Sequence, residues 1–344
     1  MGKSYESASS ILLCAEDKSS ILTFDGEEEA EGHYSGWEIE PKSCLSYGDF
    51  FKNFPLLPDE CLNLLLTREA EHLPREDYAK RLMCGQLEWS IRRDAIDWIL
   101  KVHAYYKFGP SSAFLSINYL DRFLSCYELP QGKAWMTQLL SVACLSLASK
   151  MEETEVPLLI DLQAGEAKFV FESRTIQRME LLVLSTLNWR MQAVTPFSFV
   201  YSFLYKLNNG DSLPKVLTGR AVELILCTTR GIDFLAFLPS EIAAAAAMSA
   251  ISENRSVDFR GKITWCSEVD QGRVYRCYEM LQEEMLTDRE NPIDGIPSVA
   301  CVPQSPNGVL DAARLSYKSD EMTSDSQPIQ YYSSPAAKRR KTTI

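Results

Sequence analysis

The chain has 344 residues, 46% of them hydrophobic, which is enough for two domains of ordinary size with tails. The net charge of −12 and the isoelectric point near 4.9 argue against a protein body that binds nucleic acid. There is no apolar run of about 18 residues and no charged-then-apolar leader, so we expect neither a membrane span nor a secretory signal.

The ten cysteines are scattered along the chain and form no C-x-x-C pair. Cys144 and Cys227 lie inside apolar helical stretches. Single thiols in apolar surroundings are typical of reduced core residues in an intracellular protein, and they do not indicate a disulfide framework.

The N-terminal segment, residues 1–60, is rich in Ser, Gly and acidic residues, and we expect it to be mostly disordered. Within it, Leu12, Cys14 and Glu16 spell L-x-C-x-E. In an extended chain alternate side chains point the same way, so two small apolar anchors and one carboxylate are presented together. This arrangement is typical of a short peptide ligand, whose carboxylate accepts backbone N–H groups of a partner.

A first helical domain is predicted over residues 61–190. A short polar helix is expected over 67–81, interrupted near Pro74, and apolar residues three or four apart predict an amphipathic helix over 87–105. Gly109-Pro110 ends that helix, and Ser111 or Ser112 is the expected N-cap of the next, which runs over about 114–124. An almost wholly apolar helix over 134–151 is typical of a buried central helix, and a helix over 175–187 completes five.

A second helical domain is predicted over residues 191–290, beginning at Thr195-Pro196 as an N-cap followed by a first-turn proline. Its helices are expected over 197–207, 213–234, 240–251 and 270–286. Five consecutive alanines at 243–247 suit a tightly packed central helix. The expected fold is therefore all-α, with two tandem five-helix domains, and residues 291–344 form a second disordered tail.

The sequence offers no catalytic or metal-binding constellation. None of the three histidines has a partner at metal-ligand spacing, and His103 is expected on a helix surface. Phosphate-binding glycine loops and nucleophile motifs are missing. Asp94 and Asp97, close to Arg92, Arg93 and Lys101, are interpreted as surface charge pairing. We therefore expect a protein that is not an enzyme and needs no metal or cofactor.

Four charged residues interrupt apolar helical runs: Arg92, Asp121, Lys150 and Glu180. A charge beside a core is costly unless it is paired. Spacing alone favours an ordinary structural interpretation, in which Lys150 extends to solvent from a helix end and Glu180 lies at a solvated edge.

Four motifs resemble the successive motifs of the cyclin box in order and spacing. They are I-R-R-D-A-I-D-W at 91–98, N-Y-L-D-R-F-L at 118–124, L-A-S-K-M-E-E at 147–153 and R-M-E at 178–180. With the L-x-C-x-E segment, the chain resembles a D-type cyclin, most closely those of plants. The resemblance covers about residues 60–290 and implies two cyclin-fold domains.

The resemblance also implies roles for individual residues. Arg92 and Asp121 match the internal ion pair of the family, and Lys150 and Glu180 match the pair that contacts a cyclin-dependent kinase. Leu147 and Trp189 match apolar positions of the same kinase-facing surface. A rigid surface that binds only the active conformation of a kinase shifts the kinase toward that state.

The substrate-docking patch of the family is matched by Ile91, Trp98, Gln138 and Leu139. Asp94 stands where an aliphatic residue is usual, Ala95 is small, and Lys101 replaces an acidic rim residue. Docking of Arg-x-Leu peptides loses apolar area and charge complementarity as a result, so we expect weak or altered docking.

The two tails carry further signals. By resemblance, L-x-C-x-E is a ligand for retinoblastoma-type pocket proteins, which tethers a substrate near the kinase. Residues 319–337 resemble a PEST-type degradation signal, and Ser305 and Ser334, each before a proline, are expected phosphorylation sites. A basic cluster suited to nuclear import closes the chain, formed by Lys338, Arg339, Arg340 and Lys341.

The expected function is a regulatory subunit of a cyclin-dependent kinase that directs it to retinoblastoma-related proteins at cell-cycle entry. Kinase-inhibitor proteins are further expected partners, the nucleus is the expected location, and no direct contact with nucleic acid or membrane is expected. The alternative is a cyclin-fold transcriptional adaptor, against which the acidic charge weighs.

Overall fold

The computed structural model describes residues 47–51, 54–85, 87, 89–129, 133–163, 169–254 and 269–290. These residues form α-helices and short 3₁₀ helices, and none of them forms a strand. The L-x-C-x-E segment, the serines before proline and the basic cluster lie outside the described residues. Within the helices that are described, none is both long and apolar enough to cross a bilayer.

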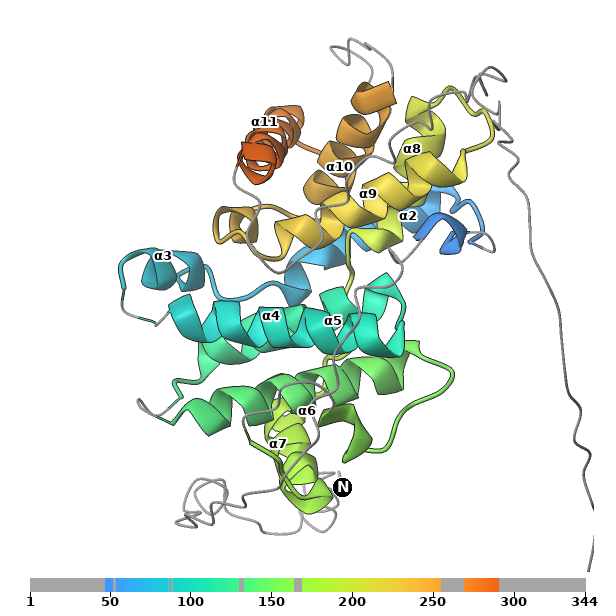
Figure 1. The fold of residues 1–344 in the computed structure, drawn as a ribbon. Helices are drawn as coiled ribbons and strands as arrows, with labels where there is room; N and C mark the ends of the chain where they lie inside the picture. The colour runs from blue at the N-terminus through green and yellow to red at the C-terminus, as the bar shows by residue number, and fades with distance from the viewer. Residues whose placement is uncertain are drawn as a thin grey trace, which may run out of the picture. The chain divides into compact units, whose positions relative to one another are not determined.

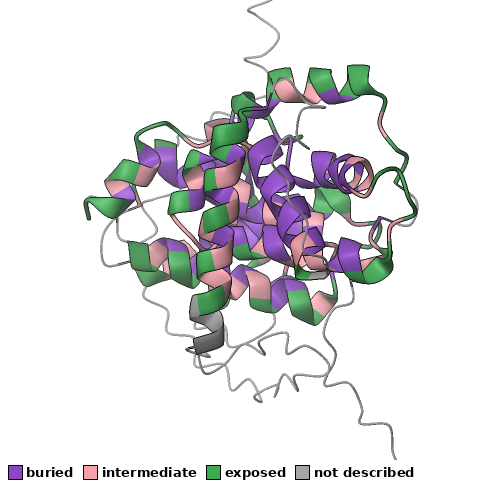
Figure 2. Ribbon diagram, turned by 90° about the horizontal axis from the view of Figure 1, so that it is seen from above, coloured by how far each residue is buried: buried purple, intermediate pink, exposed green. Residues whose placement is uncertain are grey.

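The first bundle consists of α4 (Trp89–Tyr106), α5 (Pro110–Cys126), α6 (Ala134–Glu152) and α7 (Ser173–Thr186), with the short α3 (Tyr78–Met83) beside α4 (Figure 1). Helix α6 packs against α4, α5 and α7, which makes it the central helix. Its residues from Leu139 to Ser149 are buried, as its nearly uniform apolar sequence predicts. Figure 2 shows the buried residues gathered on the inward faces of the helices.

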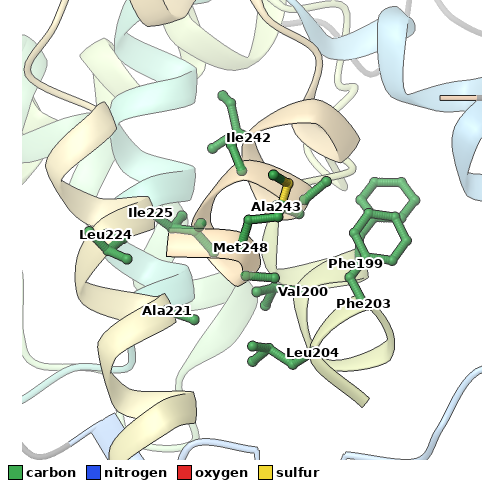
Figure 3. Packing of buried hydrophobic residues seen from close by; sticks show 14 of the residues in the cluster. Phe199, Val200, Phe203, Leu204, Ala221, Leu224, Ile225, Ile242, Ala243 and Met248 are labelled. Atoms are coloured by element: carbon green, nitrogen blue, oxygen red, sulfur yellow. The ribbon is translucent and has the colours of Figure 1, made fainter. Parts of the chain in front are cut away.

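The second bundle consists of α8 (Phe197–Leu207), α9 (Lys215–Thr228), α10 (Pro239–Asn254) and α11 (Gln271–Glu290). Helix α10 packs against the other three, and its alanines 243–247 are buried. Small side chains let the neighbouring helices approach closely, with Phe199 and Leu204 of α8 and Ile225 of α9 filling the space around them (Figure 3).

The segment before α3 packs on the second bundle. Helix η3 (Tyr47–Asp49) contacts α9, and α2 (Asp59–Arg68) contributes Leu62 to the core of the second bundle. A Cβ on Gly48 would lie 2.8 Å from the Lys215 carbonyl oxygen, so only glycine allows this approach. In η4 (Glu69–His72), Glu69 accepts hydrogen bonds from the backbone N–H and hydroxyl of Ser240, at 2.7 and 2.8 Å.

Several predictions about local structure were wrong. The expectation of a mostly disordered segment over 1–60 does not hold at its end, where Phe51 is buried with its ring stacked on Tyr201, because aromatic burial holds this part on the second bundle. The polar helix expected over 67–81 is instead the end of α2, then η4 and α3, although the predicted interruption near Pro74 is present, with Leu73 extended before it. The helix expected to reach Phe234 ends at Thr228, and Phe234 lies in η6 (Asp233–Ala236).

Both predicted serine or threonine caps were also wrong. Helix α5 begins at Pro110 with Gly109 at the N-cap, and Ser112 donates its hydroxyl to Glu153 instead. Helix α8 begins at Phe197 and receives no side-chain cap. In α5 the first-turn Pro110 has no backbone donor for a cap to satisfy, and in α8 Pro196 itself occupies the N-cap position that Thr195 was expected to fill.

Candidate functional site

Lys150 and Glu180 are brought together where the end of α6 meets α7. The Lys150 ammonium lies 2.6 Å from Glu180 Oε1, and the Ser146 hydroxyl donates to the same oxygen at 2.5 Å. Glu180 is 7% exposed, so it is a buried carboxylate and not the solvated edge residue that spacing alone favoured. The second carboxylate oxygen makes no hydrogen bond to any described residue, which leaves it available to a donor from a partner protein.

Ser146 was not singled out from the sequence, although it lies four residues before Lys150 and therefore on the same face of α6. It holds the Glu180 carboxylate from one side while Lys150 approaches from the other. Since half of the Lys150 side chain remains accessible, the pair presents one fixed carboxylate and one ammonium at the surface.

Apolar residues flank this pair in sequence. Leu147, on α6 between Ser146 and Lys150, is buried, whereas Trp189, just after α7, is 62% exposed. Leu181 and Met151, next to Glu180 and Lys150 in sequence, are also exposed. Exposed apolar side chains beside a fixed ion pair are typical of a protein-binding surface.

Trp189 owes its position to an uncommon backbone conformation. Asn188 and Trp189 have φ angles of 52° and 61°, and the Trp189 N–H donates to the Leu184 carbonyl at 2.9 Å. A bulky residue in the left-handed region costs about 1 kcal/mol or more.

Arg92 and Asp121 form a buried pair between α4 and α5. The guanidinium contacts both carboxylate oxygens, at 2.7 and 3.0 Å, and the Tyr78 hydroxyl donates to the same carboxylate at 2.9 Å. Burial and the Asp121 charge raise the pKa of Tyr78, so its hydroxyl remains a donor. Arg92 also donates to the Thr229 and Arg230 carbonyls just after α9, and so it joins the two bundles.

The charges expected to pair on the surface of α4 do so only in part. Arg93 contacts Asp94, but Arg92 is buried, and Asp97 pairs with Arg230 of the second bundle. His103 is not on a surface, because it faces the start of α5 and lies 3.1 Å from the Gly109 carbonyl through Nε2. Cys144 is buried as expected, whereas Cys227 is exposed because it lies on the outer face of α9.

Of the expected docking patch, Ile91 and Trp98 lie on α4 and Gln138 and Leu139 on α6, two helices that pack together. Leu139 is buried, and Trp98 has an enclosed indole nitrogen without a partner. The Gln138 amide is already engaged by the chain itself, donating to the Phe169 carbonyl at 2.9 Å and accepting from its N–H at 3.2 Å. A peptide that needs this amide would have to replace both bonds.

Comparison with known families agrees with this architecture. Residues 60–192 match the model of the cyclin N-terminal domain, and residues 194–297 match that of the cyclin C-terminal domain. The chain belongs to the cyclin family. Cyclins are non-catalytic regulatory subunits of protein kinases.

Among cyclins, the chain is a D-type member similar to those of plants. It is 48% identical to Cyclin-D4-1 of Oryza sativa subsp. japonica over 98% of both chains, and 48% identical to Cyclin-D3-1 of the same plant over 99% of both. The fold resembles the X-ray structure of a viral cyclin from herpesvirus saimiri, with a TM-score of 0.51 and 17% identity over 58% of this chain and 85% of the other.

Proposed function

We propose that this cyclin activates a cyclin-dependent serine/threonine kinase and promotes the G1/S transition by directing that kinase to retinoblastoma-related proteins. The observation that supports the kinase role is the fixed Lys150–Glu180 pair, together with the exposed Trp189 just after α7. Because this surface is already ordered, no binding energy is lost in ordering it. The surface can therefore favour one conformation of its partner. No group of the cyclin takes part in phosphoryl transfer.

The test is activation of a co-expressed cyclin-dependent kinase toward a retinoblastoma-type substrate. Lys150→Ala/Glu180→Ala is expected to abolish activation, because it removes both charged groups of the proposed interface. Arg220→Ala/Glu253→Ala removes a comparable ion pair from the second bundle and is expected to leave activation unchanged. Equal activity of the two double variants would place the interface elsewhere.

No activation with any tested kinase, together with a gel shift on promoter DNA, would favour the transcriptional adaptor. We expect no gel shift, because the net charge of −12 opposes binding to a polyanion.

Substrate choice is proposed to rest on Leu12, Cys14 and Glu16 in the N-terminal segment. Cys14→Gly/Glu16→Lys is expected to abolish binding to a retinoblastoma-related pocket protein, since it removes one anchor and reverses the charge of the carboxylate. Activation of the kinase toward a peptide substrate should be unchanged. Unaltered pocket-protein affinity of the variant would contradict the assignment.

Docking of Arg-x-Leu peptides is proposed to be weak, because the Gln138 amide is engaged with Phe169 and Lys101 repels a basic peptide. Calorimetry with a plain Arg-x-Leu peptide should show little heat. Tight binding that Trp98→Ala removes would contradict the proposal.

Nuclear location is proposed from the basic cluster at 338–341. Arg339→Ala/Arg340→Ala should move a fluorescent fusion of the full chain toward the cytoplasm. A nuclear signal as strong as that of the unaltered chain would contradict this role.

A further inference from the structure

Two arginines of the described residues are buried, and they differ in their partners. Arg92, 1% exposed, is bonded to a carboxylate and two carbonyls. Arg122, 6% exposed, makes one hydrogen bond, from Nη1 to the Asn118 amide oxygen at 3.4 Å, and no ion pair with a described residue. A buried guanidinium without an anion is unfavourable, as is any uncompensated buried charge.

His72 lies next to this arginine. Asn118, one turn before Arg122 on α5, donates its amide to the His72 carbonyl at 3.0 Å. The His72 side chain is 4% exposed, and its Nδ1 is enclosed without a hydrogen-bond partner. Two buried polar side chains with unused hydrogen-bonding capacity therefore lie side by side where η4 meets α5.

Two further arginines complete the cluster. The Tyr119 hydroxyl donates to the Met191 carbonyl at 2.6 Å, which fixes the segment containing Arg190 against α5. Burial lowers the pKa of His72, and the positive charges of Arg122, Arg68 and Arg190 lower it further, against the opposing charge of Glu71. Burial and Arg190 likewise lower the pKa of Arg122. The cluster thus concentrates positive charge with one carboxylate nearby.

Such a cluster is unfavourable in the isolated chain and becomes favourable when an anion enters it. Arginine forks match the oxygen geometry of phosphate, and a dianion balances several positive charges better than one carboxylate does. Arg68 and Arg190 are exposed, whereas Arg122 and His72 are buried, so the cluster combines positive charges that solvent reaches with one that it does not.

We propose that Arg122, Arg190 and Arg68, gathered around His72, form a binding site for a phosphoryl group carried by a phosphorylated serine or threonine of a partner protein. The site adjoins Trp189 in sequence but does not depend on the kinase role. It makes the affinity of this cyclin for that partner depend on the phosphorylation state of the partner.

The first test follows the His72 ring signal by NMR in the full chain, which has three histidines. Inorganic phosphate should shift that signal to saturation, while sodium chloride at equal ionic strength should not, and His103 serves as the internal control. Arg122→Gln should weaken phosphate binding about tenfold or more, the effect of losing a charge-assisted bond of about 1.5–3 kcal/mol. Arg174→Gln, an exposed arginine of α7, is the matched control and should change nothing.

Arg190→Gln replaces an exposed arginine of the cluster and should also weaken phosphate binding. This variant provides the test if Arg122→Gln does not fold. The second test uses a degenerate peptide library with one fixed phosphothreonine, compared with the same library carrying threonine. Binding of the phosphorylated library alone, lost with Arg190→Gln, is the expected result. A response equal in wild type and both arginine variants, a response to chloride, or capture of phosphate without any phosphopeptide would overturn the proposal.

Discussion

At Arg92 a single guanidinium satisfies a carboxylate of α5 and two carbonyls at the end of α9. These contacts are enclosed, so removal of either charged partner leaves the other without compensation. The pair is thus a structural element that fixes α4 against both bundles, in contrast with Arg122, whose charge remains unmatched.

Arg92→Met should lower the free energy of unfolding by about 3–5 kcal/mol, because Asp121 becomes a buried, unpaired carboxylate. Arg92→Met/Asp121→Leu should cost less than the sum of the two single substitutions, since no isolated charge remains. Urea denaturation at neutral pH measures both. Additive losses would show that the pair itself contributes little.

His103 makes stability depend on pH. Burial lowers its pKa below the ordinary value of 6.5, while the nearby Gly109 carbonyl and Glu153 oppose that effect. The folded state therefore binds a proton less readily than the unfolded state. The stabilisation is complete above about pH 6.5 and is lost as the pH falls through the lowered folded-state pKa, with a slope of up to about 1.4 kcal/mol per pH unit.

Because His72 and carboxylates also titrate on acidification, the measurement is the difference between wild type and His103→Gln over pH 7.5 to 5.5. The variant should lose less stability on acidification than the wild type. Parallel stability curves would show that His103 is not responsible.

Among the elements, α6 and α10 occupy equivalent central positions in their bundles. Both are apolar or small around their whole circumference, and both are buried along most of their length. Side-chain size, rather than a single apolar face, decides how closely their neighbours approach. The alanines of α10 are therefore expected to tolerate little added volume.

Ala246→Leu should lower the free energy of unfolding by about 1–3 kcal/mol, because three further carbons must fit a closed core. Ala104→Leu, on the exposed face of α4, is the matched control and should change stability by about 0.5 kcal/mol or less. Thermal melting of both variants measures the two changes in stability. A neutral Ala246→Leu would indicate an unfilled space beside α10.

In the described structure, the chain that precedes α3 packs largely on the second bundle, while His72 contacts α5 of the first. Phe51 and Leu62 enter its core, and Glu69 binds the first turn of α10. The segment before α3 thus attaches the beginning of the described chain to the second bundle. The hydrogen bonds from Arg92 to the Thr229 and Arg230 carbonyls also connect the two bundles.

Phe51→Ala should destabilise the protein by about 3–5 kcal/mol, the usual cost of removing a buried phenyl ring. Leu64→Ala, at an exposed position of α2, should have little effect. Denaturant unfolding followed by tryptophan fluorescence measures both. Equal small effects would show that the N-terminal segment is not part of the cooperative unit.

The sequence by itself determined the all-α class, the two helical domains and the positions of the long helices, because those properties follow from local periodicity and composition. It also marked Lys150, Glu180, Arg92 and Asp121 as charges within apolar helical runs, and the resemblance to the cyclin box implied their roles. Only the tertiary structure decided which charges are buried and what they contact. Three contacts join residues that are distant in sequence, and no local pattern encodes them. They are Ser146 with Glu180, Arg230 with Asp97, and His72 with Arg122.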